Sequence, residues 1–289
     1  MAVTIVMKTR GIFGKIPPFS DLLKPGFSYG TWTDGFIINP DISGDNTLLY
    51  RKDSIARGLN LGLGDRSLLT FKLALPTSDE EIKDFYEYIM FLCGKLEVVT
   101  FEKNGTSCSI ADIPRLTEED MAASRESLFQ IEKNMENSDI SSMYIFGVTN
   151  PLAMGREDLK AIGGDMARFA DFLDGKQRYK GRYVAPKLEV YKDAGEKKRR
   201  SFFRKDTDSA DDRYRGTFEV GIGEELIFPL VPRSLNKKEA RVMIWQVKVK
   251  LGPEEIRTFA FDDFIKKIDR SVPYDSEHVF INLKAEDFD

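Results

Sequence analysis

The chain has 289 residues, which is long enough to bury a large core without help from a metal or a disulfide. Hydrophobic residues make up 42%, and 43 basic and 47 acidic side chains leave a net charge of −4. This composition excludes the disordered class, and it gives no global field that would attract a polyanion. No apolar run approaches the roughly 18 residues that span a bilayer. We therefore expect a chain that folds by itself, without a membrane segment, and nucleic acid is not an expected partner.

The first 65 residues are interrupted by Gly, Pro, Asn and Asp at short intervals. Such spacing permits only short strands and turns. The clearest strand there is 3–8, because Val3, Ile5 and Met7 alternate onto one face.

A strand and a helix are predicted next. Alternation over 68–75 indicates a half-buried strand. Ser78, followed three residues later by Glu81, predicts a capping box in which hydroxyl and carboxylate both bond backbone donors at the helix start. The helix is expected to end near Gly94. Its buried face should consist of Ile82, Phe85, Ile89, Leu92, Cys93 and Leu96.

A hairpin is predicted over 96–102 and 106–111, since Asn104-Gly105 suits a tight turn. A second helix is expected to begin at Thr117, because three acids follow it, and to end near Asn137. Further strands are predicted at 143–148, 182–191, 217–222, 242–250 and 278–283, with a helix at 156–173 that breaks at Gly163-Gly164 and a short helix at 263–269.

These elements predict an α+β fold with mostly antiparallel sheets and segregated amphipathic helices. The chain is expected to form an N-terminal half, 1–140, and a C-terminal half, 141–289, or one continuous domain. The strand, helix and hairpin of 68–111 form the centre of the first half.

The sequence contains no CxxC, no HExxH and no phosphate loop, so we expect neither a metal nor a cofactor. His278 is the single histidine, and no partner for it can be identified from spacing. A structural role is therefore favoured over a catalytic one. The two cysteines, Cys93 and Cys108, are expected to be free thiols of a cytoplasmic protein.

One surface motif suggests a partner. It is a basic and aromatic strip, the candidate contact strip, formed by Lys197, Lys198, Arg199, Arg200, Phe202 and Phe203. Because Asp206, Asp208, Asp211 and Asp212 follow at once and would neutralise the field, a solvated hairpin end is the favoured interpretation. Weak association with nucleic acid through 197–200 ranks third among the functional hypotheses.

Four segments carry a resemblance to a known family. They are residues 50–58 (YRKDSIARG), the unit from Leu73 to Leu96 with Pro76-Thr77-Ser78 at its turn, residues 144–148 (YIFGV) and residues 176–179 (KQRY). In these segments the chain resembles a bacterial family, domain of unknown function 4299. The resemblance implies a bacterial, cytoplasmic, single-chain protein, and it implies no activity, cofactor or active-site residue.

The sequence shows no set of nucleophile, base and orienting group. The first hypothesis is therefore a non-enzymatic binding or accessory protein of the bacterial cytoplasm, with another protein as the expected partner. The alternative is an enzyme whose carboxylates converge only in the folded chain.

Overall fold

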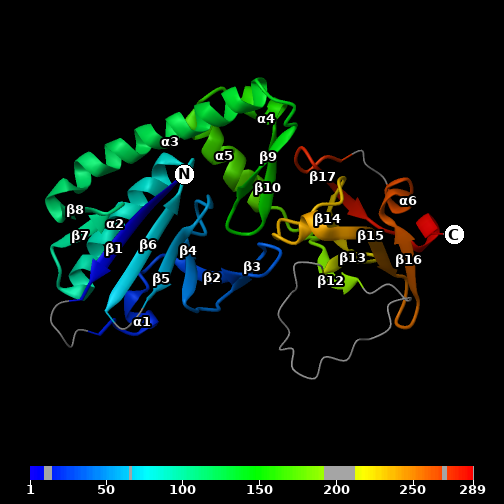
Figure 1. Cartoon of the computed structure of the whole chain (residues 1–289), viewed down its shortest axis with the longest axis horizontal. Coiled ribbons are helices and arrows are strands. Elements are labelled where there is room, and N and C mark those ends of the chain that lie inside the picture. Colours follow the sequence, from blue (N-terminus) through cyan, green and yellow to red (C-terminus); the bar gives the residue numbers. More distant parts are fainter. Residues whose placement is uncertain (10–14, 65–66, 192–211, 269–271, 289) are drawn as a thin grey trace. The chain divides into compact units, whose positions relative to one another are not determined.

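The computed structural model describes residues 1–9, 15–64, 67–191, 212–268 and 272–288 (Figure 1). They form two compact units, Met1–Tyr179 (unit 1) and Lys180–Asp289 (unit 2). As predicted, the fold is α+β with mostly antiparallel sheets.

The boundary between the units lies later in the chain than residue 140, where the sequence analysis placed the junction of two halves. The reason is helix α5 (Met166–Gln177), which is hydrogen-bonded to an early loop. Asp174 Oδ1 accepts from the Ile55 N–H at 2.7 Å, and Gln177 Nε2 donates to the Ala56 carbonyl at 2.7 Å. These bonds hold α5 in unit 1.

Unit 1 is built on an eight-stranded antiparallel sheet in the order β3-β2-β4-β5-β6-β1-β7-β8. The strands before residue 65 are three to seven residues long, as the glycines and prolines predict. The elements are β1 (Ala2–Lys8), α1 (Phe19–Leu22), β2 (Ser28–Trp32), β3 (Ile38–Pro40), β4 (Asn46–Tyr50), β5 (Leu59–Leu63), β6 (Leu68–Ala74), β7 (Thr100–Lys103) and β8 (Thr106–Ser109).

Helix α2 (Asp79–Leu96) buries its apolar stripe in the core of unit 1, which it shares with β1 and β6. All six residues predicted for its buried face are buried. Phe85 stacks on Phe71 of β6 with ring centroids 4.9 Å apart. The helix continues past Gly94 to Leu96, so the following strand begins only at Thr100; the turn at Asn104-Gly105 has the predicted positive φ angles of 50° and 84°.

Helix α3 (Ile113–Glu136) begins four residues earlier than the predicted start at Thr117. A 3-10 turn, η1 (Ile110–Asp112), leads into it, and Asp112 Oδ2 accepts from the Ser109 N–H at 2.9 Å. Asp120 is therefore inside the helix and buried. It accepts hydrogen bonds from the Tyr86 hydroxyl and, at 2.7 Å, from Lys103 Nζ. The acid that predicted a helix start instead links α3 to α2 and β7.

Unit 1 continues with β9 (Ser142–Phe146), β10 (Pro151–Gly155), α4 (Arg156–Ile162) and α5, and Figure 1 shows α3, α4 and α5 in green. The predicted helix is broken as expected, because Gly163 and Gly164 have φ angles of 59° and 73°. The connection between β9 and β10 packs on β4. Val148 forms a small cluster there with Leu48 and Tyr50, so β4 is buried on both faces.

Unit 2 holds a three-stranded sheet, β11-β14-β17, and a four-stranded sheet, β12-β13-β15-β16. Two pairs are parallel, β11 with β14 and β13 with β15. Phe218 of one sheet and Phe228 of the other share a core with Phe261 and Phe264 of α6. The elements are β11 (Arg182–Tyr183), β12 (Lys187–Tyr191), β13 (Arg213–Gly221), β14 (Glu225–Pro229), η2 (Glu239–Arg241), β15 (Val242–Lys250), β16 (Ile256–Ala260), α6 (Phe261–Ile265), β17 (His278–Asn282) and η3 (Ala285–Phe288).

Several predicted boundaries in unit 2 differ from the structure. The strand predicted at 182–191 is two strands of different sheets, β11 and β12, separated around Pro186, which cannot donate to a ladder. Helix α6 covers Phe261–Ile265 instead of 263–269, because Phe261 and Phe264 both point into the core. Strand β13 begins at Arg213 rather than Thr217, since it pairs with β12 over its first residues.

We predict that Phe85→Ala lowers the free energy of unfolding by about 3 to 5 kcal/mol, because it removes a fully buried ring and leaves a cavity. Chemical denaturation followed by circular dichroism measures the loss. Phe129→Ala is the control, since Phe129 is 53% exposed on α3 and should cost much less. Equal losses in the two variants would mean that the packing of α2 on β6 is wrong.

Candidate functional site

The candidate contact strip lies outside the described residues. Lys197, Lys198, Arg199, Arg200, Phe202 and Phe203 all belong to the segment 192–211. Of the acids that were expected to neutralise the strip, Asp212 alone is described. Tyr191 and Arg213, the strand residues on either side of the segment, pair across β12 and β13.

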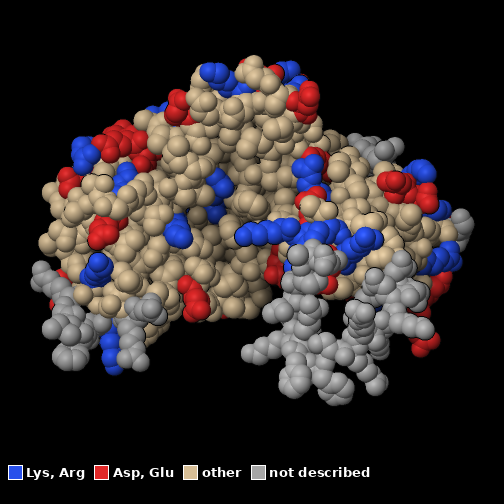
Figure 2. All heavy atoms as spheres, in the orientation of Figure 1, with Lys and Arg blue, Asp and Glu red and all other residues tan. Residues whose placement is uncertain are grey.

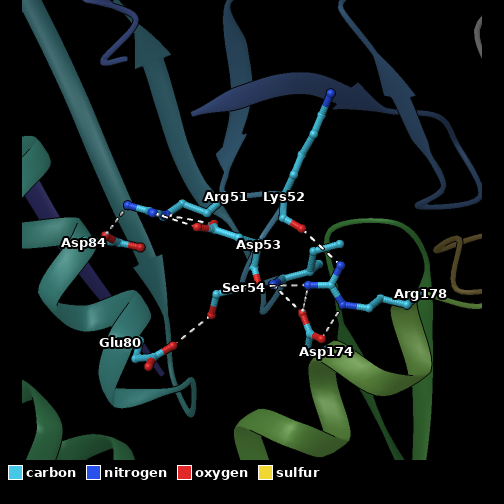
Figure 3. A network of polar contacts seen from close by, with 9 residues as sticks. Arg51, Lys52, Asp53, Ser54, Glu80, Asp84, Asp174 and Arg178 are labelled. Atoms are coloured by element: carbon cyan, nitrogen blue, oxygen red, sulfur yellow. Dashed lines mark hydrogen bonds and ion pairs between the residues drawn. The ribbon is translucent and has the colours of Figure 1, made fainter. Parts of the chain in front are cut away.

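A dense polar network surrounds the segment Arg51–Gly58, the 51–58 loop, which joins β4 to β5. Figure 3 shows it between side chains of α2 and α5. The hydrogen bonds come from residues in all four segments that carry the family resemblance. We therefore take this loop and its partners as the candidate functional site.

Glu81 is the buried anchor of the loop. One carboxylate oxygen accepts from the Gly58 N–H at 2.6 Å and from the Arg57 N–H at 3.1 Å; the other accepts from the Thr77 hydroxyl. The predicted capping box is therefore only half correct. The Ser78 hydroxyl accepts from the Glu81 N–H at 3.1 Å as expected, but the Glu81 carboxylate turns away from Ser78 because the loop supplies buried donors.

Gly58 is required at the end of the loop. Its φ angle is +78°, a conformation that residues with a side chain rarely adopt. A Cβ atom there would lie 2.8 Å from the side chain of Leu48. The backbone can therefore turn its N–H towards Glu81 only if no side chain is present.

The Arg57 side chain crosses the site from the loop to two other segments. Its guanidinium donates to the Phe146 carbonyl at the end of β9, at 3.2 Å, and to the Pro76 carbonyl, at 3.1 Å. Burial lowers the pKa of Arg57 to about 10, and the charge of Glu81 opposes that shift. Burial also raises the pKa of Glu81, against the hydrogen bonds from Thr77, Gly58 and Arg57. The buried charges thus sit among donors and acceptors that offset part of their desolvation.

Side chains at the end of α5 bond the backbone of the middle of the loop. Arg178, just after the helix, donates to the carbonyls of Lys52 and Asp53 at 3.1 and 2.9 Å. Although burial acts in the opposite direction, hydrogen bonds from Arg178 and from the Ile55 N–H lower the pKa of Asp174. Gln177 bonds the Ala56 carbonyl, so four of the five peptide groups between Lys52 and Arg57 are bonded to one helix end.

The outer part of the loop is bonded to α2. Ser54 Oγ donates to Glu80 Oε2 at 3.0 Å. Arg51 lies between Asp53, whose carboxylate it contacts at 2.8 Å, and Asp84, at 3.6 Å. Hydrogen bonds from Arg51 lower the pKa of Asp53 to about 2. Partial burial instead raises the pKa of Asp84 to about 6, because the contact with Arg51 is longer and Glu87 adds like charge.

The carboxylates of the site hold the 51–58 loop in place. Asp53, Glu80, Glu81, Asp84 and Asp174 converge on it from three segments, and each one contacts a protein donor or cation. Within the described residues, no group of three or more His, Cys, Asp or Glu side chains could hold a metal ion. Asp84 has its pKa raised to about 6 and is only partly buried. It is therefore suited to proton exchange near neutral pH.

His278 lies in unit 2, whereas the 51–58 loop lies in unit 1. Its Nδ1 is 2.7 Å from Asp275 Oδ1 and its Nε2 is 2.8 Å from the Tyr183 hydroxyl. The imidazole is 1% exposed, and the same Asp275 oxygen accepts from the backbone N–H of His278. These are the features of a structural histidine that closes a turn before β17.

Both cysteines are free and buried. Burial raises the pKa of the Cys93 thiol to about 11, which keeps it protonated and unreactive. Cys108 donates weakly to the Thr106 carbonyl at 3.6 Å within the hairpin. Neither thiol contributes to the candidate site.

A protein-family model described as Domain of unknown function (DUF4299) matches residues 3–289. The chain belongs to this family. No curated protein and no solved structure gives a significant match. The resemblance found in the four sequence segments is thereby confirmed over essentially the whole chain. No helix in the described part of the chain has the length and apolar character needed to cross a membrane.

Sequence reasoning missed the 51–58 loop as a site, although its residues were among those that carried the resemblance. Glu81 was interpreted as part of a helix cap, and Asp174 and Arg178 had no assigned role. The sequence feature that could have indicated the site was Arg57-Gly58 after a charged stretch. The sequence does not show that α2 and α5 both contact this loop.

We predict that Glu81→Ala lowers the free energy of unfolding by about 3 to 5 kcal/mol, because it leaves the Arg57 charge and two backbone N–H groups without their buried partner. The neighbouring variant Glu80→Ala removes an exposed hydrogen bond and should cost no more than about 1 kcal/mol. Urea denaturation compares the two, and hydrogen exchange should show that the Gly58 amide loses protection only in Glu81→Ala. Equal costs would exclude Glu81 as the anchor.

A second prediction concerns pH. The pKa of Asp84 is raised from 3.8 to about 6, so the folded protein binds a proton more readily than the unfolded chain between these values. The contribution of Asp84 to stability is therefore present at low pH and is lost as pH rises to about 6. Carbon NMR of the carboxyl groups should show a midpoint near this value that disappears in Asp84→Asn.

Asp53→Asn is the matched control for this titration. Since the pKa of Asp53 is lowered to about 2, its contribution is present at higher pH and is lost only in strong acid. Removing it should leave the titration near neutrality intact. A titration midpoint of Asp84 at its ordinary value would contradict the burial of this carboxylate.

Proposed function

We propose that the protein is a non-enzymatic binding or accessory protein of the bacterial cytoplasm, and that the 51–58 loop presents a fixed contact surface to another protein. One observation carries the proposal: the carboxylates that converge on the loop are engaged in holding it. A loop held at nearly every residue loses little further conformational entropy on binding, which favours its use in recognition.

The surface that this loop offers is small and charged. Lys52 and Asp53 are exposed, and the Lys52 side chain extends away from the network (Figure 3). Both carbonyls beneath them are held by Arg178. A partner would therefore meet a lysine and a carboxylate at set positions, an arrangement that gives specificity through charge complementarity.

Two further observations support the proposed origin and cellular location. The free thiols of Cys93 and Cys108 fit a reducing compartment. The resemblance in the four segments pointed to a bacterial family, and the family model spans residues 3–289. The thiols support the proposed compartment, and the resemblance supports the proposed bacterial origin.

An enzyme remains the second candidate, and Asp84 is the observation that favours it. Glu81 and Asp84 lie three residues apart on α2, and the pKa of each is raised by burial. Carboxylates with raised pKa values can transfer protons near neutral pH. In an enzyme of this kind Asp84 would be the acid or base, and Glu81 would position the loop.

Affinity purification from the native cell tests the proposal. We expect Lys52→Glu to reduce recovery of a specific partner by about tenfold or more, because it reverses the exposed charge of the loop while leaving the carbonyl contact intact. Lys160→Glu is the control: its side chain is 71% exposed on α4, and recovery should not change. If both variants retain the partner equally, the loop is not the contact. Conversion of a small-molecule extract by the wild type, but not by Asp84→Asn, would favour the enzyme.

A further inference from the structure

The four-stranded sheet of unit 2 has one face in the core and one face turned away from it. Phe218 and Val220 of β13 and Val247 and Val249 of β15 are buried in the core. Because side chains alternate along a strand, the intervening residues point to the opposite face. We call this the basic face, because it carries five cations: Lys187 of β12, Arg213 and Arg215 of β13, and Lys248 and Lys250 of β15.

The basic face has an excess of positive charge. Its acids are Glu189 and Glu219, and Glu219 is already paired with Lys187 at 2.7 Å. Within the described part of unit 2, Arg213, Lys248 and Lys250 form no ion pair with a carboxylate. Arg213 and Lys250 are exposed and Lys248 is half-buried. The register places Arg213 beside Tyr191 at one end of the face and Lys248 and Lys250, about 7 Å apart along β15, at the other end, with Glu219 opposite Lys248.

Arg215 adds a flat group to this surface. Its guanidinium lies over the ring of Tyr191 on the neighbouring strand, 5.3 Å from the centroid. Its Nε is buried and makes no hydrogen bond in the described structure, and Glu189 lies opposite Arg215 on β12. A guanidinium plane supported by an aromatic ring is a platform on which a base can stack.

Apolar side chains complete the face. Ile244 lies opposite Arg215 in the register, and Ile256 lies opposite Lys250; they are 36% and 60% exposed. Exposed aliphatic groups between cations suit a ligand that has both charges and flat apolar faces. Bases and phosphates have this combination.

We propose that the basic face of unit 2 binds single-stranded nucleic acid. The cations contact phosphates, and Arg215 on Tyr191, with Ile244, contacts the bases. A duplex is a poorer fit, because its bases are stacked inside the helix, where Arg215 and Ile244 could not contact their faces. This inference goes beyond the protein contact proposed for unit 1 and concerns different residues.

The basic face is a local feature that the charge of the whole chain does not report. Unit 1 has 20 basic and 26 acidic residues, whereas unit 2 has 23 basic and 21 acidic residues, of which 7 basic and 5 acidic lie in 192–211. The acidic excess therefore belongs to unit 1. Figure 2 shows blue and red side chains interspersed over the visible face of unit 1, without a large area of one sign.

Fluorescence anisotropy with a labelled single-stranded oligonucleotide tests the proposal. We expect binding at low salt that weakens linearly on a log–log plot against salt, since each neutralised phosphate contributes about 0.7 to the slope for a single strand. The triple variant Arg213→Glu, Lys248→Glu and Lys250→Glu should reduce that slope by about 2 and the affinity at low salt by more than about tenfold. Arg215→Ala should weaken binding and should change the slope by no more than about 0.7, the contribution of one neutralised phosphate.

The control variant makes the same change in charge on unit 1, at the exposed residues Lys83, Lys133 and Lys160, each changed to Glu. Circular dichroism establishes that all variants are folded. Equal weakening by both triple variants would overturn the proposal, as would absence of salt-dependent binding by the wild type. So would loss of binding on changing Lys197 to Arg200 to Ala while the basic-face variant still binds. Heparin that competes as well as the oligonucleotide would show that the ligand is any polyanion and would likewise overturn the assignment to nucleic acid.

Discussion

The structure of unit 1 depends on one buried carboxylate. Glu81 lies in the first turn of α2, where it bonds the backbone of Arg57 and Gly58 and the hydroxyl of Thr77. An ionised group in the interior costs several kcal/mol unless its hydrogen bonds are satisfied. The loop, the turn before α2 and the helix start must therefore keep their relative positions. Arg57 extends this constraint to the carbonyl of Phe146, so β9 is held by the same group of interactions.

The apolar core explains why α2 can carry this group. Leu69, Phe71 and Leu73 on β6 are fully buried, and Phe71 stacks on Phe85. Burial of these side chains fixes which face of α2 meets the sheet. Glu81 lies beside this stripe and is directed at the loop between β4 and β5. On the other side of the helix, Tyr86 contacts Asp120 of α3. Helix α2 thus carries residues of two polar networks, around Glu81 and around Asp120, and its packing on β6 fixes the position of both.

The two units display different surfaces. Unit 1 presents a loop whose backbone is held from two helices, and its exposed groups are one lysine and one carboxylate. Unit 2 presents a sheet face in which cations on neighbouring strands outnumber acids. Hydrogen bonds that fix a loop favour recognition of shape and of a few charges, whereas cations on a flat sheet favour an extended polyanion. We infer a binding protein with separate surfaces for separate partners.

The sequence by itself determined the α+β class, the strand, helix and hairpin around α2, the buried stripe of that helix and the break at Gly163-Gly164, because these follow from local periodicity and turn chemistry. It also determined the family. Only the tertiary structure decided the partners of Glu81, the burial of Asp120 inside α3, the boundary after Tyr179 and the contact between His278 and Tyr183. The bonds of Glu81 with Gly58 and of His278 with Tyr183 join residues far apart in the chain, and spacing carries no information about which distant donor reaches a side chain. The basic face required the structure for the same reason: alternation assigns residues to faces, but the strand order placed β13 beside both β12 and β15.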